Sequence, residues 1–498
     1  MAQSWAQVSG IDSVALRSFI ILIMFFGVRP WILAVYRLYF HPLKDFPGPK
    51  EACVSHKWLY NRSLERFPEE TFERLHKKYE TKALRIAPNE LHITDIHSYK
   101  VIYNQIRPFP KHAPFYDGFN TPHTLFAETD PALHKERRRM LNPLFSHQGV
   151  FRLEPVLQTK LSLLLDKLDR LCGQGTVNVY DAFRTLTTEI IMEFAFARSA
   201  NMINEQEQSF DSWFLRGFDV AAQSILEMQY RPLLRKVSRK IPRSIIRTIS
   251  PEIAMILEIQ DFAASSMNHW QKNGNNTDHP VLFDRLTLLS DEDKVHEAMD
   301  ILIAGADTTA STLTTGLAHI LAKPAVNSKL REALAAVPIG PDGRLAMQDL
   351  EKCSYLAAVV KECIRIGMAV PGRLPRVVPE GERFMVDNKL IPVGTVVSMS
   401  TYTMHTSTEA WGPDAREFNP ERWLGPNAQG LESWMCTFSK GARMCIGQNF
   451  APAEISLALA YLFTRYRLRL PTNARHSLPR DLFTLTYPLG LDVVFEKL

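Results

Sequence analysis

The chain has little cysteine, no large excess of either charge and a mean hydropathy below zero. Six cysteines in 498 residues are too few for a disulfide framework, and no two form a Cys-x-x-Cys pair of the kind that binds zinc or exchanges disulfides. The 58 Lys and Arg residues exceed the 53 Asp and Glu residues by five, so no nucleic-acid partner is predicted. A mean hydropathy of −0.13 excludes a polytopic membrane protein.

The residues that are present indicate a large, mostly helical body. Helical periodicity predicts helices over 70–79, 155–171, 181–197, 210–226, 253–274, 290–323 and 448–462. Short strands are predicted at 83–86, 90–94, 377–392 and 491–495. We therefore predict a mainly α fold with small β-sheets, an α+β architecture. It is divided into an anchor and linker over 1–44 and one catalytic domain over 45–498.

The segment 14–36 is nearly all apolar, and its unbroken run from 19 to 28 is followed by Arg29, Arg37 and Lys44. This pattern predicts a single-pass helix in the lipid bilayer, with the body on the cytosolic side by the positive-inside rule. A cleaved signal peptide and an amphipathic leader are the alternatives. Two formal glycosylation acceptors, Asn61 and Asn275, should then carry no sugar.

The predicted helix over 290–323 is weakened at its centre. Ser290 is a suitable N-cap residue, and Pro324 ends the helix. Its middle, Ala304–Thr309, holds a glycine, an acid and two threonines where alanine or leucine would favour a helix more. The segment is either a core helix with tolerated small residues or a groove where a ligand meets the backbone.

A ten-residue stretch near the C-terminus carries the clearest chemistry. It contains Phe438, Gly441, Arg443, Cys445 and Gly447, and a helix is predicted to follow it. A thiolate at a helix N-terminus is stabilised by the unpaired backbone N–H groups, so Cys445 is suited to bind a metal. The two glycines permit a sharp turn and the close approach of a flat cofactor, and Arg443 can pair with a carboxylate.

This stretch resembles the haem-binding motif of the cytochrome P450 superfamily, Phe-x-x-Gly-x-Arg-x-Cys-x-Gly, in all five fixed positions. The resemblance is closest to microsomal fungal members of secondary metabolism and covers about residues 40 to 498. It implies haem b, with Cys445 as the metal ligand and with Phe438, Gly441, Arg443 and Gly447 around the cofactor.

Further motifs follow in the order that the family has them. Glu362 and Arg365 match its Glu-x-x-Arg, and Arg422 would complete a buried structural network with them. Ala304–Thr309 resembles the oxygen-binding groove, which implies catalytic roles in proton delivery for Thr308 and Asp307.

The resemblance also implies residues that bind the haem propionates. His134 stands where the family often has tryptophan, and Arg138 follows it at the family's spacing. Arg376 matches another propionate-binding arginine, with Arg373 as its rival. Of the neighbouring basic residues, Arg137 or Arg139 is expected on the water-facing side of its helix.

The implied activity is a monooxygenase that transfers one atom of O2 to an apolar, terpenoid-like small molecule. A haem-thiolate isomerase or dehydratase, a fatty-acid hydroxylase and a silent haem- or lipid-binding protein are the alternatives. Asp300 is expected to bond solvent rather than a substrate hydroxyl. The expected pocket residues are Phe115, Phe119, Phe126, Ile303, Ala304, Val370 and Leu489.

No flavin or Gly-x-Gly-x-x-Gly dinucleotide motif is present. Electrons are therefore expected from NADPH through a separate cytochrome P450 reductase on the endoplasmic reticulum membrane. Lys440, Lys135 and Arg139 form a candidate docking face for this partner.

Overall fold

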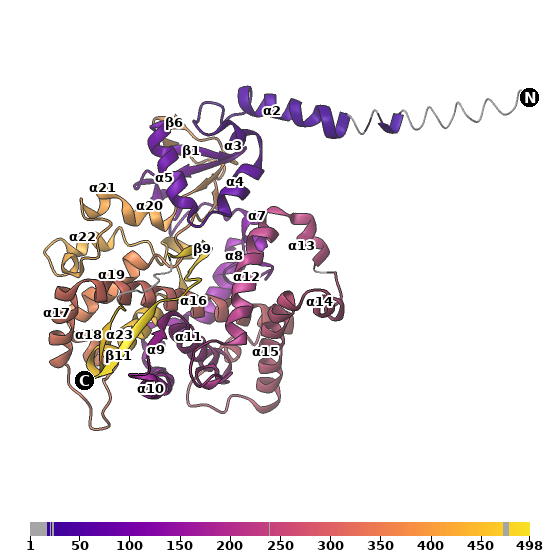
Figure 1. Ribbon diagram of the computed structural model, residues 1–498. Coiled ribbons are helices and arrows are strands. Elements are labelled where there is room, and N and C mark those ends of the chain that lie inside the picture. The colour runs from indigo at the N-terminus through magenta and orange to yellow at the C-terminus, as the bar shows by residue number, and fades with distance from the viewer. Residues whose placement is uncertain (1–16, 20, 22–23, 239, 472–477) are drawn as a thin grey trace, which may run out of the picture.

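One long helix, α16 (Asp291–Ala322), runs through the body of the protein in this computed structural model (Figure 1). The structure describes residues 17–19, 21, 24–238, 240–471 and 478–498. Ser290 caps α16 as predicted, because its hydroxyl accepts a hydrogen bond of 3.1 Å from the backbone N–H of Asp293. The helix ends before Pro324, which is the first residue of α17 (Pro324–Ala335).

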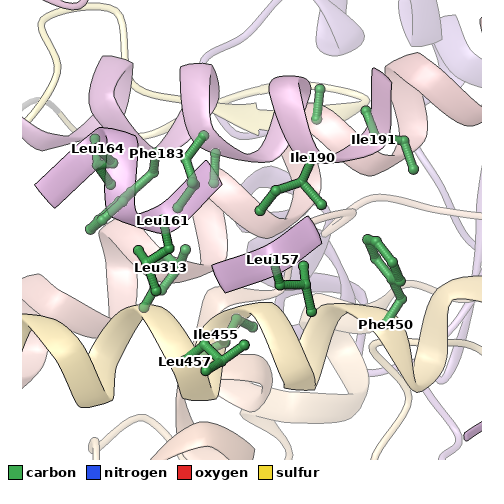
Figure 2. Packing of buried hydrophobic residues seen from close by; sticks show 14 of the residues in the cluster. Leu157, Leu161, Leu164, Phe183, Ile190, Ile191, Leu313, Phe450, Ile455 and Leu457 are labelled. Atoms are coloured by element: carbon green, nitrogen blue, oxygen red, sulfur yellow. The ribbon is translucent and has the colours of Figure 1, made fainter. Parts of the chain in front are cut away.

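The main apolar core surrounds α16 and joins it to α10 (Glu154–Leu171), α11 (Val179–Phe196) and α23 (Phe450–Arg465). Nearly every residue of α11 is buried, as in a helix that neighbours cover on all sides. Figure 2 shows side chains of these four helices that meet in the core: Leu157, Leu161, Leu164, Phe183, Ile190, Ile191, Leu313, Phe450, Ile455 and Leu457.

The predicted helices are present with ends shifted by a few residues. The other α-helices of the described residues are α2 (Arg29–Tyr39), α3 (Lys50–Val54), α4 (His56–Ser63), α5 (Pro68–Tyr79), α6 (Ser98–Ile102), α7 (Ala113–Tyr116), α8 (Pro131–Phe145), α9 (His147–Phe151), α12 (Trp213–Tyr230), α13 (Pro232–Ser238), α14 (Arg243–Ile249), α15 (Pro251–Asn273), α18 (Met347–Lys352), α19 (Ser354–Gly367), α20 (Thr401–Thr406), α21 (Thr408–Trp411) and α22 (Ala428–Glu432).

The strands form small sheets at the periphery of this helical body. The largest has the order β1 (Ala83–Ala87), β2 (Glu90–Ile93), β7 (Val396–Ser398) and β4 (Arg376–Val377), and β2 and β7 are parallel. A second sheet joins β3 (Thr176–Asn178), β11 (Asp492–Lys497) and β8 (Tyr466–Arg469). Two hairpins pair β5 (Met385–Val386) with β6 (Lys389–Leu390) and β9 (Arg480–Leu482) with β10 (Thr484–Thr486).

The short strands predicted around 377–392 are present as three separate two-residue strands, β4, β5 and β6. Gly381 adopts a φ of 77°, and Asp387 and Asn388 adopt φ of 52° and 59° in the turn between β5 and β6. These left-handed residues turn the chain and interrupt one continuous strand.

The N-terminal segment leaves the body as a π-helical turn (Met24–Val28) and α2 (Figure 1). Part of the predicted anchor, residues 14–16, 20 and 22–23, lies outside the described residues. In the part of the chain that the structure describes, no helix has the length and apolar character needed to cross a bilayer.

Candidate functional site

The loop between Phe438 and α23 is held in one shape by its backbone. Gly441 has a φ of 74°, and a Cβ atom here would lie 2.4 Å from the carbonyl oxygen of Asn104, so only glycine fits. The backbone N–H of Cys445 donates a hydrogen bond of 2.8 Å to the carbonyl of Phe438. The loop therefore fixes the position of the Cys445 sulfur.

Cys445 is exposed, whereas the loop residues on both sides of it are half-buried or buried. Burial raises the pKa of this thiol, and the Gly447 backbone and the Arg138 charge oppose the shift. A Cβ atom on Gly447 would lie 3.8 Å from the sulfur. The exposed Cys445 is thus accessible to a ligand.

The centre of α16 also has an accessible side. Ala304 is exposed and Thr308 half-buried, although most of their helical neighbours are buried. The Thr308 hydroxyl donates a hydrogen bond of 2.8 Å to the carbonyl of Ala304, one turn earlier. Gly305 points elsewhere, because a Cβ atom there would lie 2.9 Å from Ile191 of α11. Ala304 and Thr308 therefore line the accessible groove of α16, whereas Gly305 lets α16 pack closely against α11.

The two rival arginines have different partners. Arg373 forms an ion pair of 2.5 Å with Glu90 and donates to the Tyr230 hydroxyl. Arg376 is 2% exposed, and its partners among the described residues are neutral groups such as the Tyr116 hydroxyl and backbone carbonyls. Because Arg373 already has a carboxylate, Arg376 is the arginine available to bind an anion.

Further cations lie close to Arg376. Lys111 is 8% exposed, pairs with Arg376 in a backbone bridge and donates to the carbonyl of Phe126. Its pKa is lowered well below the usual value by burial, and then by the charges of Arg376 and Arg443. Burial, followed by the charge of Arg376, also lowers the pKa of Arg443 to about 10. Sequence reasoning missed Lys111, because nothing in its local pattern marks it as buried.

His134 and Arg138 of α8 complete this cationic set. Burial, followed by the charge of Arg443, lowers the pKa of His134 to about 3, so its imidazole is neutral. Arg138 donates to the carbonyl of Met444, next to Cys445, and Arg443 donates to the carbonyl of Glu128. A neutral imidazole and guanidinium groups all offer N–H donors.

This arrangement fits the haem that the family resemblance implies. Lys111, Arg138, Arg376 and Arg443 are buried or half-buried, and none forms an ion pair with a carboxylate among the described residues. Burying a cation without an acidic partner lowers the stability of the folded protein, and an anionic ligand that pairs with the cation restores that stability. An accessible thiol beside cations without acidic partners suits a metal cofactor that carries carboxylates.

Asp307 lies behind the groove and is buried. Its carboxylate accepts a hydrogen bond of 2.8 Å from Nε of Arg184 in α11, and Arg184 is also 2.9 Å from Asp219 in α12. The Asp307 side chain is 4% exposed, whereas that of Asp219 is 42% exposed. Arg184 and the more exposed Asp219 therefore connect the buried Asp307 to the surface.

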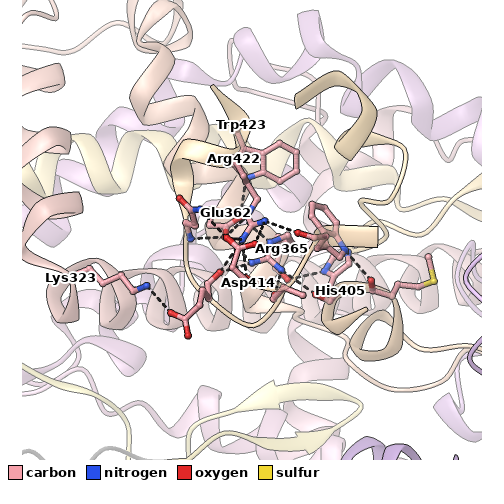
Figure 3. Close-up of polar contacts among 12 residues, drawn as sticks. Lys323, Glu362, Arg365, His405, Asp414, Arg422 and Trp423 are labelled. Atoms are coloured by element: carbon pink, nitrogen blue, oxygen red, sulfur yellow. Dashed lines mark hydrogen bonds and ion pairs between the residues drawn. The ribbon is translucent and has the colours of Figure 1, made fainter. Parts of the chain in front are cut away.

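The predicted Glu–Arg–Arg residues come together in Figure 3. Glu362 lies 2.7 Å from Arg365 and 3.2 Å from Arg422, and the indole N–H of Trp423 donates to it at 2.9 Å. Arg422 also forms an ion pair of 2.9 Å with Asp414. The two charges of the Glu362–Arg365 pair are fully buried, so their hydrogen bonds compensate the loss of water.

His405, which sequence reasoning missed, links this network to the cysteine loop. Its Nδ1 donates to the carbonyl of Arg365 at 2.8 Å, and its Nε2 accepts a hydrogen bond of 2.9 Å from the backbone N–H of Cys436. Burial lowers the pKa of His405 to about 3, which keeps the ring in the neutral form that these two bonds require. The network thereby positions the chain just before Phe438.

Four phenylalanine rings gather at the tip of the β9–β10 hairpin. Phe483 lies 4.7 Å from Phe119 and 5.8 Å from Phe126, centroid to centroid, and Phe115 lies 6.3 Å from both Phe119 and Phe483. Phe483 has a φ of 80°, which is rare for a residue with a side chain. The pairing of Leu482 with Thr484 makes Phe483 the single residue at the tip.

The other expected pocket residues differ in their surroundings. Leu489 is 65% exposed in a turn whose Gly490 packs against Asn178, whereas Phe483 lies among the phenylalanine rings. Ile303 packs against the main core. Val370 is half-buried beside Ala369, whose carbonyl binds the hairpin.

Acids of α16 bind neighbouring segments, and one further expectation fails for this reason. Asp300 accepts hydrogen bonds from the hydroxyls of Thr121, at 2.7 Å, and Thr124, so it holds a loop rather than solvent. Arg137 is buried and lies 3.4 Å from Glu297, whereas Arg139 is exposed. Of the two, Arg139 is the one that faces water.

Comparisons with known proteins agree with this geometry. A family model described as Cytochrome P450 matches residues 47–492. The chain is 32% identical over 477 residues to Cytochrome P450 monooxygenase macH of Penicillium terrestre, with 92% of each chain covered. It is 31% identical over 465 residues to Conidiogenone synthase PchP450 of Penicillium rubens, covering 90% of this chain and 92% of that relative. The crystal structure of cytochrome P450DA heme domain has a TM-score of 0.75 at 19% identity, covering 91% of this chain and 98% of that one, and shows the likeness of fold.

Proposed function

Because the chain belongs to the cytochrome P450 family and is a P450 monooxygenase, we propose that it oxidises an apolar, terpenoid-like molecule of secondary metabolism. One atom of O2 enters the substrate and the other leaves as water. The observation that carries the proposal is the accessible Cys445 sulfur beside cations that lack acidic partners among the described residues. The fungal P450 relatives support the assignment to secondary metabolism.

The proposed cofactor is haem b, iron protoporphyrin IX, whose iron the Cys445 thiolate would bind. Bound in this way, the haem supplies O2 activation, because a thiolate pushes electron density toward the iron and favours O–O cleavage. Phe438, Gly441 and Gly447 shape the loop around the sulfur. The residues proposed to hold the haem carboxylates are Lys111, His134, Arg138, Arg376 and Arg443.

Thr308 is proposed to hold a proton donor in the groove. Its hydroxyl lies on the accessible side of α16 and bonds the Ala304 carbonyl. Asp307 stands next to it in sequence and connects through Arg184 to the exposed Asp219. Rotation of the Arg184–Asp219 pair would let Asp307 exchange a proton with water. This arrangement favours O2 cleavage over isomerisation or dehydration, which need no such supply.

The substrate is proposed to contact the phenylalanine cluster of Phe115, Phe119, Phe126 and Phe483, together with Ala304. Four rings from two segments of the chain offer a wide apolar surface, as small-molecule sites usually do. A compact polycyclic skeleton would contact several rings at once. A flexible fatty acid would lose more conformational entropy there.

Electrons are proposed to come from NADPH through a separate reductase. Lys135 and Arg139 on α8 are exposed, and half-buried Lys440 precedes the cysteine loop. These cations suit the acidic surface of a flavodoxin-like partner. Reversing all three charges should raise the apparent KM for reductase and weaken its salt dependence, and no change in either would refute the docking face.

We also propose that the N-terminal segment anchors the protein in the endoplasmic reticulum membrane, with the catalytic domain in the cytosol. Exposed apolar residues of α2, among them Trp31 and Ile32, support membrane contact. Endoglycosidase treatment of full-length protein tests the topology at Asn61 and Asn275. A shift in mass would place the body in the lumen.

The proposed function is tested with holoprotein, reductase, NADPH and a panel of terpenoids and fatty acids. We expect saturable shifts of the Soret band with terpenoids and NADPH consumption coupled to their oxidation. Saturable shifts with fatty acids alone would overturn the substrate class. Product formation without NADPH or O2 would identify an isomerase or dehydratase instead.

A further inference from the structure

A small cavity borders the phenylalanine cluster, and Phe115 and Phe483 form part of its wall. Its volume of about 60 Å³ is enough for a hydroxyl group and the carbon atom that carries it. The rest of the wall comes from α4, α5, α12 and the chain around the β9–β10 hairpin, and it includes the polar residues Ser63, Glu69, Gln229, Arg373 and Asp481. A molecule that lies on the rings can therefore extend a polar group into this cavity.

Glu69 of α5 is a buried acid in the cavity wall. The residue is 2% exposed, and its Oε2 atom forms no hydrogen bond among the described residues, although Nε2 of His92 lies 3.2 Å away. The great majority of buried polar side-chain atoms in proteins have a hydrogen-bond partner. Glu69 therefore has a free acceptor for a donor group that enters the cavity.

Asp481 of β9 is a second acid in this wall and is 8% exposed. Its Oδ1 accepts a hydrogen bond of 2.9 Å from the backbone N–H of Phe483, whereas its Oδ2 has no donor among the described residues. A Cβ atom on Gly372 would lie 3.1 Å from Oδ2, so the lack of a side chain at Gly372 leaves this oxygen open. Burial, followed by the charge of Glu69, raises the pKa of Asp481 to about 7.

Arg373 carries the positive charge of this wall, but it is already paired. Its guanidinium group binds Glu90 at 2.5 Å and donates to the Tyr230 hydroxyl, so neither Asp481 nor Glu69 has it as an ion-pair partner. Its charge nevertheless disfavours a second cation in the same small cavity. A neutral group that donates a hydrogen bond therefore suits the two carboxyl groups better than an ammonium group does.

Resting on the proposed function, we propose that this cavity binds a hydroxyl group of the substrate, so that the natural substrate is an already hydroxylated terpenoid and not an unoxidised hydrocarbon. The hydroxyl group donates to Oδ2 of Asp481, and Glu69 accepts a hydrogen bond from a second hydroxyl group or from a water molecule beside it. The carbon skeleton lies on Phe115 and Phe483. A substrate of this class comes from a reaction that adds oxygen or water to the skeleton before this enzyme acts.

The first test measures the binding of matched alcohols and ethers to the wild-type holoprotein. The probes are the polycyclic terpenoid alcohols cedrol and patchoulol and the methyl ether of each, titrated by the shift of the Soret band. We expect each alcohol to bind about tenfold or more tightly than its ether, because the ether has no O–H to donate. Equal affinities would overturn the hydroxyl site and leave the proposed function standing. No shift with any of the four probes would refute the proposed substrate class itself.

The second test uses Gly372→Ala, which places a methyl group against Oδ2 of Asp481 and leaves the bond from Oδ1 to Phe483 in place. The preference for alcohol over ether should disappear, with the ether affinity within about twofold of wild type. Gly430→Ala is the matched control, because Gly430 is exposed and a Cβ atom there meets no atom within 4 Å. It should keep the preference.

A third variant keeps the test decisive if Gly372→Ala fails to fold and lacks the 450 nm band. Asp481→Asn keeps an acceptor for the N–H of Phe483 but removes the carboxylate, so the alcohol should lose about tenfold in affinity and the ether should not. A full preference for the alcohol in either folded variant would overturn the role of Asp481.

Discussion

Lys111 and Arg376 face each other in an antiparallel bridge, and both carry buried side chains without a carboxylate partner among the described residues. Two positive charges this close together destabilise the protein when no ligand is bound. An anionic ligand between them would remove the repulsion. Arg373, three residues before Arg376, forms its ion pair with Glu90 and so takes no part. The pairing of Lys111 with Arg376 is the clearest sign of an anion site.

Lys111→Met should weaken haem retention. Removing one charge-assisted hydrogen bond corresponds to roughly a tenfold to hundredfold faster release of haem from the holoprotein. Transfer of haem to an excess of apomyoglobin, followed by absorbance, measures this rate. Lys135→Met is the control, because Lys135 is exposed on α8. Equal release rates for the two variants would contradict the role of Lys111.

Thr308→Ala should keep the haem and divert electrons to hydrogen peroxide. The hydroxyl lies on the accessible side of α16, so its loss interrupts proton supply without changing the core. Peroxide released per NADPH oxidised measures the effect, and we expect product per NADPH to fall by about tenfold or more. Ser311→Ala serves as control, because this buried hydroxyl bonds only the Thr308 carbonyl. Unchanged coupling in Thr308→Ala would refute the role.

Phe483→Ala should alter ligand choice. The ring is at the tip of the β9–β10 hairpin and touches three other phenylalanines, so its removal opens the cluster. Ligand-induced Soret shifts should show weaker binding of small terpenoids, by about tenfold for a loss of 1–2 kcal/mol of apolar contact. Leu489→Ala should leave those affinities unchanged. A larger effect from Leu489 than from Phe483 would contradict the assignment of the turn.

Asp300→Asn should change the pH dependence of stability. Burial raises the pKa of Asp300 to about 6, against the hydrogen bonds of Thr124 and Thr121. A raised folded-state pKa stabilises the protein below the unfolded pKa of about 4, and this contribution is lost as the pH rises through about 6. The variant should therefore gain about 1–2 kcal/mol relative to wild type between pH 4 and 7. The free energy of unfolding of each holoprotein is measured in urea at several pH values. If the two free energies change with pH in the same way, the prediction is contradicted.

The sequence predicted the parts of the site that are fixed by local spacing. The cysteine loop, the N-cap at Ser290 and the Glu362–Arg365 pair each depend on residues a few positions apart. The family resemblance, by contrast, placed Leu489 in the pocket, whereas this residue is 65% exposed. The residue that meets the phenylalanines is Phe483, which occupies an unusual φ that no local pattern marks.

The missed residues have roles that depend on three-dimensional partners. In the sequence, Lys111 resembles an ordinary surface lysine, and only the structure shows that it binds a backbone carbonyl instead of an acidic side chain. Arg184 likewise resembles an ordinary charged residue of a helix, and only the structure shows its ion pair with Asp307. The sequence also left open which of Arg137 and Arg139 faces water, and the ion pair of Arg137 with Glu297 decides it. Whether a charge is paired is a property of the fold, so sequence spacing alone does not decide it.

The central claim is that Cys445 binds haem iron as a thiolate, and the reduced carbon monoxide difference spectrum tests it most directly. Wild-type holoprotein and the control Cys172→Ala should both show the Soret band at about 450 nm that a thiolate ligand produces, whereas Cys445→Ala should lack it. A normal band near 450 nm in Cys445→Ala would contradict the account.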